Sequence, residues 1–272
     1  MFHLLSALSL LLAVSALPNP SPTPTRVLAQ RQEPSLQASL TYASNNPAAT
    51  TNRQANPSIS PELTQQLAVA ATVGDRFKII YDQGPDYWKF DFLPNSNPYG
   101  GLTLGRGGEV VLANKKNYPI LWDQGVSVSL GFMNPCGMNT PHIHPRATEF
   151  NIAVSELTLP LRAGFVFEND FNLEFRVNIS QYQGASFPRG ATHFEMNPNC
   201  EPAVFVAAFS NDDPGLSSIA NNFFRIDADI INSTLGFPRE ISGENIAQFA
   251  TSIPTPFVVA VTECLDCCGI PY

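Results

Sequence analysis

The chain has 272 residues and a formal net charge of -8, and 44% of its residues are apolar while 14% are charged. This composition excludes a collagen-like or wholly disordered chain, and without a run rich in Lys and Arg there is no basic face for a nucleic-acid partner. The length alone allows one or two domains.

The chain opens with an apolar run from Leu4 to Val14, and Ala16 then precedes a stretch rich in Pro. This order is typical of a secretory signal peptide over residues 1–16, with cleavage after Ala16. The apolar run is too short to span a bilayer, so we expect no membrane partner once the signal is removed. The sequence therefore predicts a secreted protein, extracellular or in the cell wall.

Residues 17–58 contain seven Pro among 42 positions and hardly a large apolar side chain. Such a segment buries too little surface to offset the entropy of ordering, so we expect a flexible tail rich in Pro, Ser and Thr. Subtracting these first 58 residues leaves 214, residues 59–272. That length suits one domain, with a core from about 75 to 225.

Pro61 and Glu62 follow Ser60, which predicts a helix from this point up to Gly74. Short apolar or alternating runs separated by turn residues come next and are typical of strands. These runs are 109–114, 127–133, 149–154, 161–168, 173–179 and 203–210. Two short helices are expected late, over 226–237 and 242–253. The predicted fold class is all-β, a sandwich or barrel with short flanking helices.

The chain has five cysteines, an odd number, so in a secreted protein at least one thiol is free or bonded to another molecule. They are Cys136, Cys200, Cys264, Cys267 and Cys268. Cys264 and Cys267 have the spacing of half a zinc site or of a redox dithiol, but a disulfide that staples the C-terminus is favoured. A bridge between Cys136 and Cys200 is a further possibility, and so is a bridge between two chains.

Two segments hold three of the four histidines and concentrate the chemistry. His142 and His144 stand two residues apart, so on a strand both imidazoles point to one face and together could hold a metal. Glu149 follows after Pro145, which interrupts a strand, so a turn must bring its carboxylate back to that face. His193 enters the next predicted strand and would supply a third imidazole.

The sequences PHIHPRATE and FPRGATHFEMN resemble the two conserved boxes of the germin-like branch of the cupin superfamily. The resemblance runs from about Gln65 to about Asn221, and the chain is also similar to spherulin-type members of fungi and slime moulds. It implies a single jelly-roll β-barrel. It also implies a Mn ion as cofactor, although another divalent transition metal fits the same donors. The implied ligands are His142, His144, Glu149 and His193.

Germins are oxalate oxidases, and the resemblance implies two Asn side chains that hold the oxalate. Asn139 matches one of them and is a candidate substrate contact, but Ser129 stands at the other position and lacks an amide donor. The resemblance therefore favours Mn-dependent oxidoreductase activity on superoxide or a small carboxylic acid, with oxalate oxidase as a further alternative. The other class of function is a non-catalytic metal-binding wall or storage glycoprotein of the spherulin type.

The remaining expectations concern the surface, the partners and the pocket wall. Sequons at Asn178 and Asn232 are candidate glycosylation sites. The family's assembly implies a homo-oligomer, and the partner in the pocket would be a small anionic substrate or none. Arg146 is expected to pair with a surface acid. The candidates for an apolar wall around the site are Met138, Phe150, Phe187 and Phe194.

Overall fold

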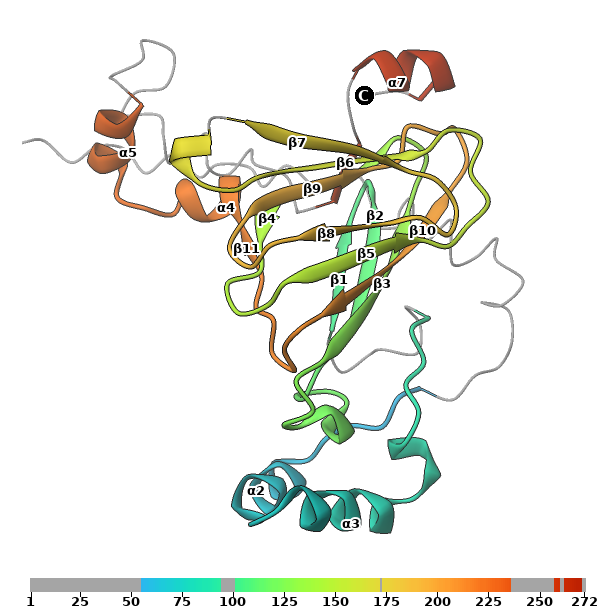
Figure 1. The fold of residues 1–272 in the computed structure, drawn as a ribbon, viewed down its shortest axis with the longest axis vertical. Helices are drawn as coiled ribbons and strands as arrows, with labels where there is room; N and C mark the ends of the chain where they lie inside the picture. The colour runs from blue at the N-terminus through green and yellow to red at the C-terminus, as the bar shows by residue number, and fades with distance from the viewer. Residues whose placement is uncertain (1–54, 94–100, 172, 236–256, 260–261, 271–272) are drawn as a thin grey trace, which may run out of the picture. The chain divides into compact units, whose positions relative to one another are not determined.

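The computed structural model describes residues 55–93, 101–171, 173–235, 257–259 and 262–270. Two sheets dominate it, and Figure 1 shows them with short helices around them. The first sheet has the strand order β1 (Leu102–Gly105), β2 (Gly108–Ala113), β3 (Ser127–Met133), β10 (Ala203–Phe209), β5 (Glu149–Ala153) and β8 (Gly184–Phe187). The second has the order β11 (Ser217–Ser218), β4 (Gly137–Ile143), β9 (Thr192–Met196), β6 (Leu161–Val166) and β7 (Glu174–Ile179), and β12 (Phe257–Val259) pairs with β4. The predicted all-β class is confirmed.

All six runs that the sequence predicts as strands are strands, and every described strand pairing is antiparallel. Side chains alternate along each strand, so one half of them points between the sheets. On β10 the inward residues include Ala203, Phe205 and Phe209, which join inward residues of the second sheet such as Leu161 in one buried cluster. This shared core holds the two sheets together, and the functional side chains lie in the same interior.

The helices are short and lie outside the sheets. They are α2 (Pro61–Val69), α3 (Val73–Gln83), α4 (Ile219–Phe223), α5 (Ala228–Thr234) and α7 (Thr262–Cys268), with the 3-10 turns Pro85–Tyr87, Pro119–Leu121 and Asn169–Phe171. The expected helix within 226–237 is therefore present as α5. None of the described helices combines the length and apolar character needed to cross a membrane.

The single helix predicted from Ser60 to Gly74 is wrong, because the chain forms two helices there. Ser60 caps α2 as expected, by accepting from the Leu63 amide at 3.1 Å. The chain then leaves the helix, and Thr72 starts α3 with a reciprocal pair of hydrogen bonds to Asp75. That capping box satisfies the free amides of a new helix N-terminus, which favours a second helix over continuation of the first.

The structure contains two disulfides, and they join α7 to the turn between β3 and β4 and to the connection between β9 and β10. Cys136 bonds to Cys264 and Cys200 bonds to Cys268, so the predicted bridge between Cys136 and Cys200 is wrong. The predicted disulfide attachment of the C-terminal segment is present, but it consists of two bonds, each to a different part of the chain. Cys267 is the free and exposed thiol. A bond from it to another chain stays a prediction.

Several expectations fall outside the described residues. The signal peptide over 1–16, most of the tail over 17–58 and the helix over 242–253 are among them. Both sequons are described: Asn178 is exposed on β7, and Asn232 lies on α5 with a half-buried side chain. Their glycosylation stays a prediction.

Candidate metal centre

The four residues expected to bind a metal come together between the two sheets. His142 lies near the end of β4 and is paired in register with His193 on β9. His144 follows β4 directly, and Glu149 is the first residue of β5 in the other sheet. One donor atom from each of the four residues lies within 4.8 Å of the others, and all four side chains are buried.

Glu149 reaches the histidines from the opposite sheet, which the alternation rule could not establish. β4 ends at Ile143, and the chain then crosses over through Pro145, so that β5 begins with the Glu149 side chain pointing inward beside Phe209 and Phe187. Its Oε2 then lies 3.0 Å from Nε2 of His144 and 3.0 Å from Nε2 of His193. The carboxylate thus joins donors of both sheets at one point.

The backbone orients all three imidazoles. Nδ1 of His142 lies 2.8 Å from the Thr140 carbonyl, and Nδ1 of His193 lies 2.9 Å from the Ala191 carbonyl. Nδ1 of His144 lies 2.5 Å from the Gly215 carbonyl. A carbonyl only accepts, so each Nδ1 carries a hydrogen, and Nε2 is the ring atom that can bind a metal once it has given up any proton it carries. This arrangement is the usual support for metal-bound histidine, so the residues present fit a divalent transition metal.

Burial and charge shift the pKa values at the site in opposite directions. Burial lowers the pKa of His142 to about 3, and the charge of His193 acts in the same sense. For His193, burial acts to lower the pKa, but the hydrogen bond to Glu149 and the charges of Glu195 and Glu149 raise it to about 9. Burial also opposes ionisation of Glu149, yet the hydrogen bonds from both imidazoles hold its pKa well below the usual range. A negative carboxylate therefore faces imidazoles, as a cation site requires.

A second polar group that the sequence analysis missed lies beside the four residues. Glu195 on β9 is buried, and its Oε2 accepts from Nδ2 of Asn139 at 3.0 Å. Nδ2 of Asn151 lies 3.2 Å from Glu149 Oε1 and 3.4 Å from Glu195 Oε1. Burial and the charge of Glu149 raise the pKa of Glu195 to about 8. Asn139 is therefore in the interior as expected, but its amide is bound to a carboxyl group.

The signal for this second group was present in the sequence. Asn151 stands two residues after Glu149, and Glu195 stands two residues after His193, so each shares the inward face of its strand. Ser129 is also buried, and it faces Ala207 on β10. Oδ1 of Asn151 has no hydrogen-bond partner among the described residues. An orphaned buried acceptor beside the four donors suits a bound water or another hydrogen-bond donor.

Only one of the four residues expected in the apolar wall is in the right place. Phe187 is buried and stacks on His193 with ring centroids 4.8 Å apart. The prediction is wrong for Phe150, Phe194 and Met138. Each stands next to an inward-pointing residue on its strand, so its own side chain points outward. Phe150, next to Glu149, is 47% exposed. The wall is completed instead by Phe209, whose ring centroid lies 4.6 Å from that of His144.

The half zinc site or redox dithiol considered for Cys264 and Cys267 is not what these residues form. Cys264 is bonded to Cys136, and Cys267 is exposed. Sulfurs in disulfides carry no thiolate, which is the form that binds zinc. Among the described residues, the His and Glu cluster is therefore the candidate metal centre.

Comparisons with known proteins agree with this geometry. Residues 98–241 match the cupin family model. The chain is 38% identical to Spherulin-1A of Physarum polycephalum over 210 residues, which cover 77% of this chain and 80% of the relative. It is 41% identical to Germin-like protein 8-9 of Oryza sativa subsp. japonica over 119 residues, 43% of this chain and 52% of the relative.

Among solved structures, a recombinant oxalate oxidase in complex with glycolate is similar in fold. The TM-score is 0.52 at 22% identity, and the match covers 63% of this chain and 83% of that one. Identity at this level supports the fold alone. Together with the spherulin and germin-like relatives, the family match over more than half of the chain decides the assignment. The chain belongs to the cupin family, as a germin-like, spherulin-type member.

Proposed function

We propose that this chain is a secreted manganese-binding cupin that acts as a Mn-dependent oxidoreductase on superoxide or on a small carboxylic acid. One observation carries the proposal. Three imidazoles with their Nδ1 atoms bound to carbonyls and one carboxylate gather in a buried interior, within 4.8 Å of one another. Four protein donors leave open positions on a six-coordinate ion, where a small molecule can bind.

Manganese is proposed from the resemblance to germins, since the donor set also suits iron, zinc, nickel and copper. His142, His144, Glu149 and His193 would hold the ion. Bound there, it would supply Lewis acidity and one-electron chemistry. The protein's own contribution is to orient the imidazoles through backbone carbonyls and to keep the interior dry with Phe187 and Phe209.

The interior argues against oxalate as the preferred substrate. Ser129 cannot offer the amide that the germin pattern has at its position. The amide of Asn139 is engaged by Glu195, and that of Asn151 by two carboxyl groups. A dicarboxylate would therefore find both side-chain amides already engaged, which costs affinity. Superoxide is smaller and carries one negative charge, so it needs fewer hydrogen-bond donors than a dicarboxylate does.

The second candidate function is a non-catalytic metal-binding glycoprotein of the wall or of a storage form. The 38% identity with Spherulin-1A, over four fifths of that protein, favours it. In this role the ion would stabilise the folded state by binding to it and not to the unfolded chain. Secretion, glycans at Asn178 and Asn232, and assembly of identical chains belong to both proposals.

The test is the metal content of the secreted protein, measured together with two activities. We expect about one Mn per chain, removal of superoxide, and little hydrogen peroxide on addition of oxalate. Turnover of oxalate would replace the first proposal by an oxalate oxidase. Bound metal without either activity would favour the second candidate, and absence of bound metal after loading with Mn²⁺ would refute both.

Variants at the site sharpen the result. His142→Ala and His193→Ala should each lose most of the bound metal, because each removes one of four donors. Phe150→Ala is the matched control, since Phe150 is next to Glu149 on β5 but points away from the interior. Full metal occupancy in either His variant would refute the ligand assignment.

A further inference from the structure

The three histidines differ in how far along the chain their orienting carbonyls lie. His142 and His193 each use a carbonyl two residues away on their own segment, Thr140 and Ala191. His144 uses the carbonyl of Gly215, which is 71 residues away. The orientation of His144 therefore depends on a separate loop, while that of the other two is set locally.

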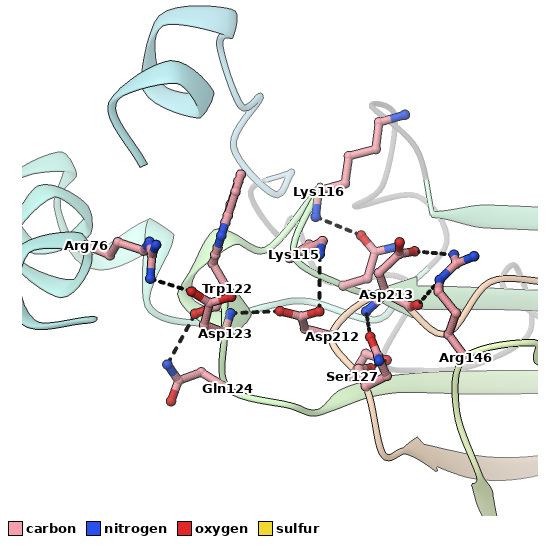
Figure 2. Close-up of polar contacts among 12 residues, drawn as sticks. Arg76, Lys115, Lys116, Trp122, Asp123, Gln124, Ser127, Arg146, Asp212 and Asp213 are labelled. Atoms are coloured by element: carbon pink, nitrogen blue, oxygen red, sulfur yellow. Dashed lines mark hydrogen bonds and ion pairs between the residues drawn. The ribbon is translucent and has the colours of Figure 1, made fainter. Parts of the chain in front are cut away.

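That loop, residues 211–215, connects β10 to β11, and Figure 2 shows the polar contacts that hold it. At its start, Ser127 Oγ donates to the Asn211 carbonyl at 2.6 Å. In its middle, Asp212 accepts from the backbone amide of Asp123 at 2.7 Å and pairs with Lys115 at 3.4 Å. These contacts fix the half of the loop that is farther from His144.

Arg146 holds the half that is closer to His144. Its Nε donates to the Asp213 carbonyl at 2.7 Å, and its Nη2 donates to Asp213 Oδ1 at 2.8 Å. Its backbone amide donates to the Pro214 carbonyl at 3.1 Å. One residue thus makes three hydrogen bonds to the two residues just before Gly215. The two bonds from the guanidinium group are charge-assisted and directional, and these are the bonds that a substitution of Arg146 removes.

Gly215 allows the loop to lie directly against Arg146. Its φ is +71°, in the left-handed region that favours glycine, and an added Cβ would lie 2.9 Å from Arg146 Nη2 and 2.9 Å from Pro145 Cγ. The guanidinium group therefore packs onto the residue whose carbonyl meets His144. Little room is left for that carbonyl to move while Arg146 is in place.

We propose that Arg146 is a positioning residue for the metal centre, acting through Asp213 and the Gly215 carbonyl to fix the orientation of the His144 ring. The inference rests on the proposed metal site. The side chain of Arg146 is itself 50% exposed and its ion pair lies at the surface, so it contributes little to folding. Its effect is on one ligand of four, through a hydrogen bond of the kind whose loss costs 10- to 100-fold in metal affinity.

The test is a competitive titration with Mn²⁺ of the full chain and three variants, with the Mn(II) electron paramagnetic resonance spectrum as a second readout. Arg146→Ala should weaken Mn²⁺ binding and broaden the spectrum, with about 10- to 100-fold, the effect of losing the hydrogen bond between His144 and Gly215 altogether, as the upper limit. Arg146→Lys keeps a charge for Asp213 but loses the Nε donor to its carbonyl, so its affinity should be intermediate. Arg176→Ala is the matched control, because Arg176 is also an exposed partner of a carboxylate, Glu174, and should leave the affinity unchanged.

The outcomes separate the inference from the proposed function. Wild-type affinity and spectrum in Arg146→Ala would overturn the inference and leave the metal site standing. A second outcome would also overturn the inference. If Arg146→Ala and Arg146→Lys lose Mn²⁺ affinity equally, and the Mn(II) that still binds has the wild-type spectrum, the loss reflects destabilised folding only. A wild-type protein that binds no Mn²⁺ would refute the proposed site itself. Gly215→Ala gives a second route, since strain at the loop should reproduce the affinity loss of Arg146→Ala.

Discussion

Replacing Glu109 by Gln should stabilise the protein at high pH and leave it almost unchanged at low pH. Glu109 lies on β2, is 1% exposed, and neither carboxyl oxygen has a hydrogen-bond partner among the described residues. Its cross-strand neighbours are Leu104 on β1 and Phe132 on β3. In this apolar setting burial raises the pKa of Glu109 from 4.5 to about 7.

The size and sign of the effect follow from that shift. Between pH 4.5 and about 7 the folded protein holds the Glu109 proton more tightly than the unfolded chain does, so its stability falls as the pH rises through this range. At about 1.4 kcal/mol for each pKa unit, the full ionisation costs about 3 kcal/mol. Gln has nearly the same shape and no charge. The difference in unfolding free energy between Glu109→Gln and wild type should therefore grow by about 2 to 3 kcal/mol from pH 5 to pH 9.

The assay is urea unfolding of the metal-free proteins across this pH range, with the difference between the two proteins taken at each pH. Taking the difference cancels the titration of the metal ligands, which both proteins share. Glu168→Gln serves as the control for loss of a carboxylate at an exposed position. If the difference in unfolding free energy between Glu109→Gln and wild type does not change with pH, the reasoning that Glu109 is buried without a hydrogen-bond partner or a counter-charge is refuted.

Two further predictions test packing and the cysteines. Gly131→Ala should destabilise the protein by about 1 to 3 kcal/mol in thermal unfolding, because the added Cβ would overlap the Phe205 ring. Gly74→Ala is the control and should not destabilise it, because the atom nearest to the added Cβ would be 3.7 Å away. Equal melting temperatures of the two variants would contradict the packing of Gly131 on Phe205. A thiol reagent should label one cysteine per native chain and none in Cys267→Ser, and labelling of two or more would contradict the two disulfides.

The strands were predictable because their signal is local. Alternation of apolar and polar residues requires only the neighbouring sequence, and it located β2, β3, β5, β6, β7 and β10, although not the short β8. The same local reading could also have found the helix break, since Thr72 and Asp75 stand at the spacing of a capping box. It was missed because the apolar residues before it continue a helical pattern without interruption.

The site was predictable in part for the same reason. The pair His142 and His144 follows from alternation, and that rule, applied once more, would have added Glu195 and excluded Phe150. Which strands lie opposite each other depends on contacts between distant segments, and these leave no mark in local sequence. The pairing of Asn139 with Glu195, and the carbonyl of Gly215 at His144, could be learned only from the folded chain.

The two disulfides also constrain the order in which the protein matures. They span 128 and 68 residues, and both require cysteines of α7, which are synthesised after Cys136 and Cys200. Cys136 Sγ lies 3.6 Å from the sulfur of Cys268, the partner of Cys200, so the two barrel cysteines are close together in space. While α7 is still being made, their nearest available partners are each other. Correct oxidation therefore has to wait until α7 has been synthesised, or a bond between Cys136 and Cys200 has to be rearranged by an isomerase afterwards.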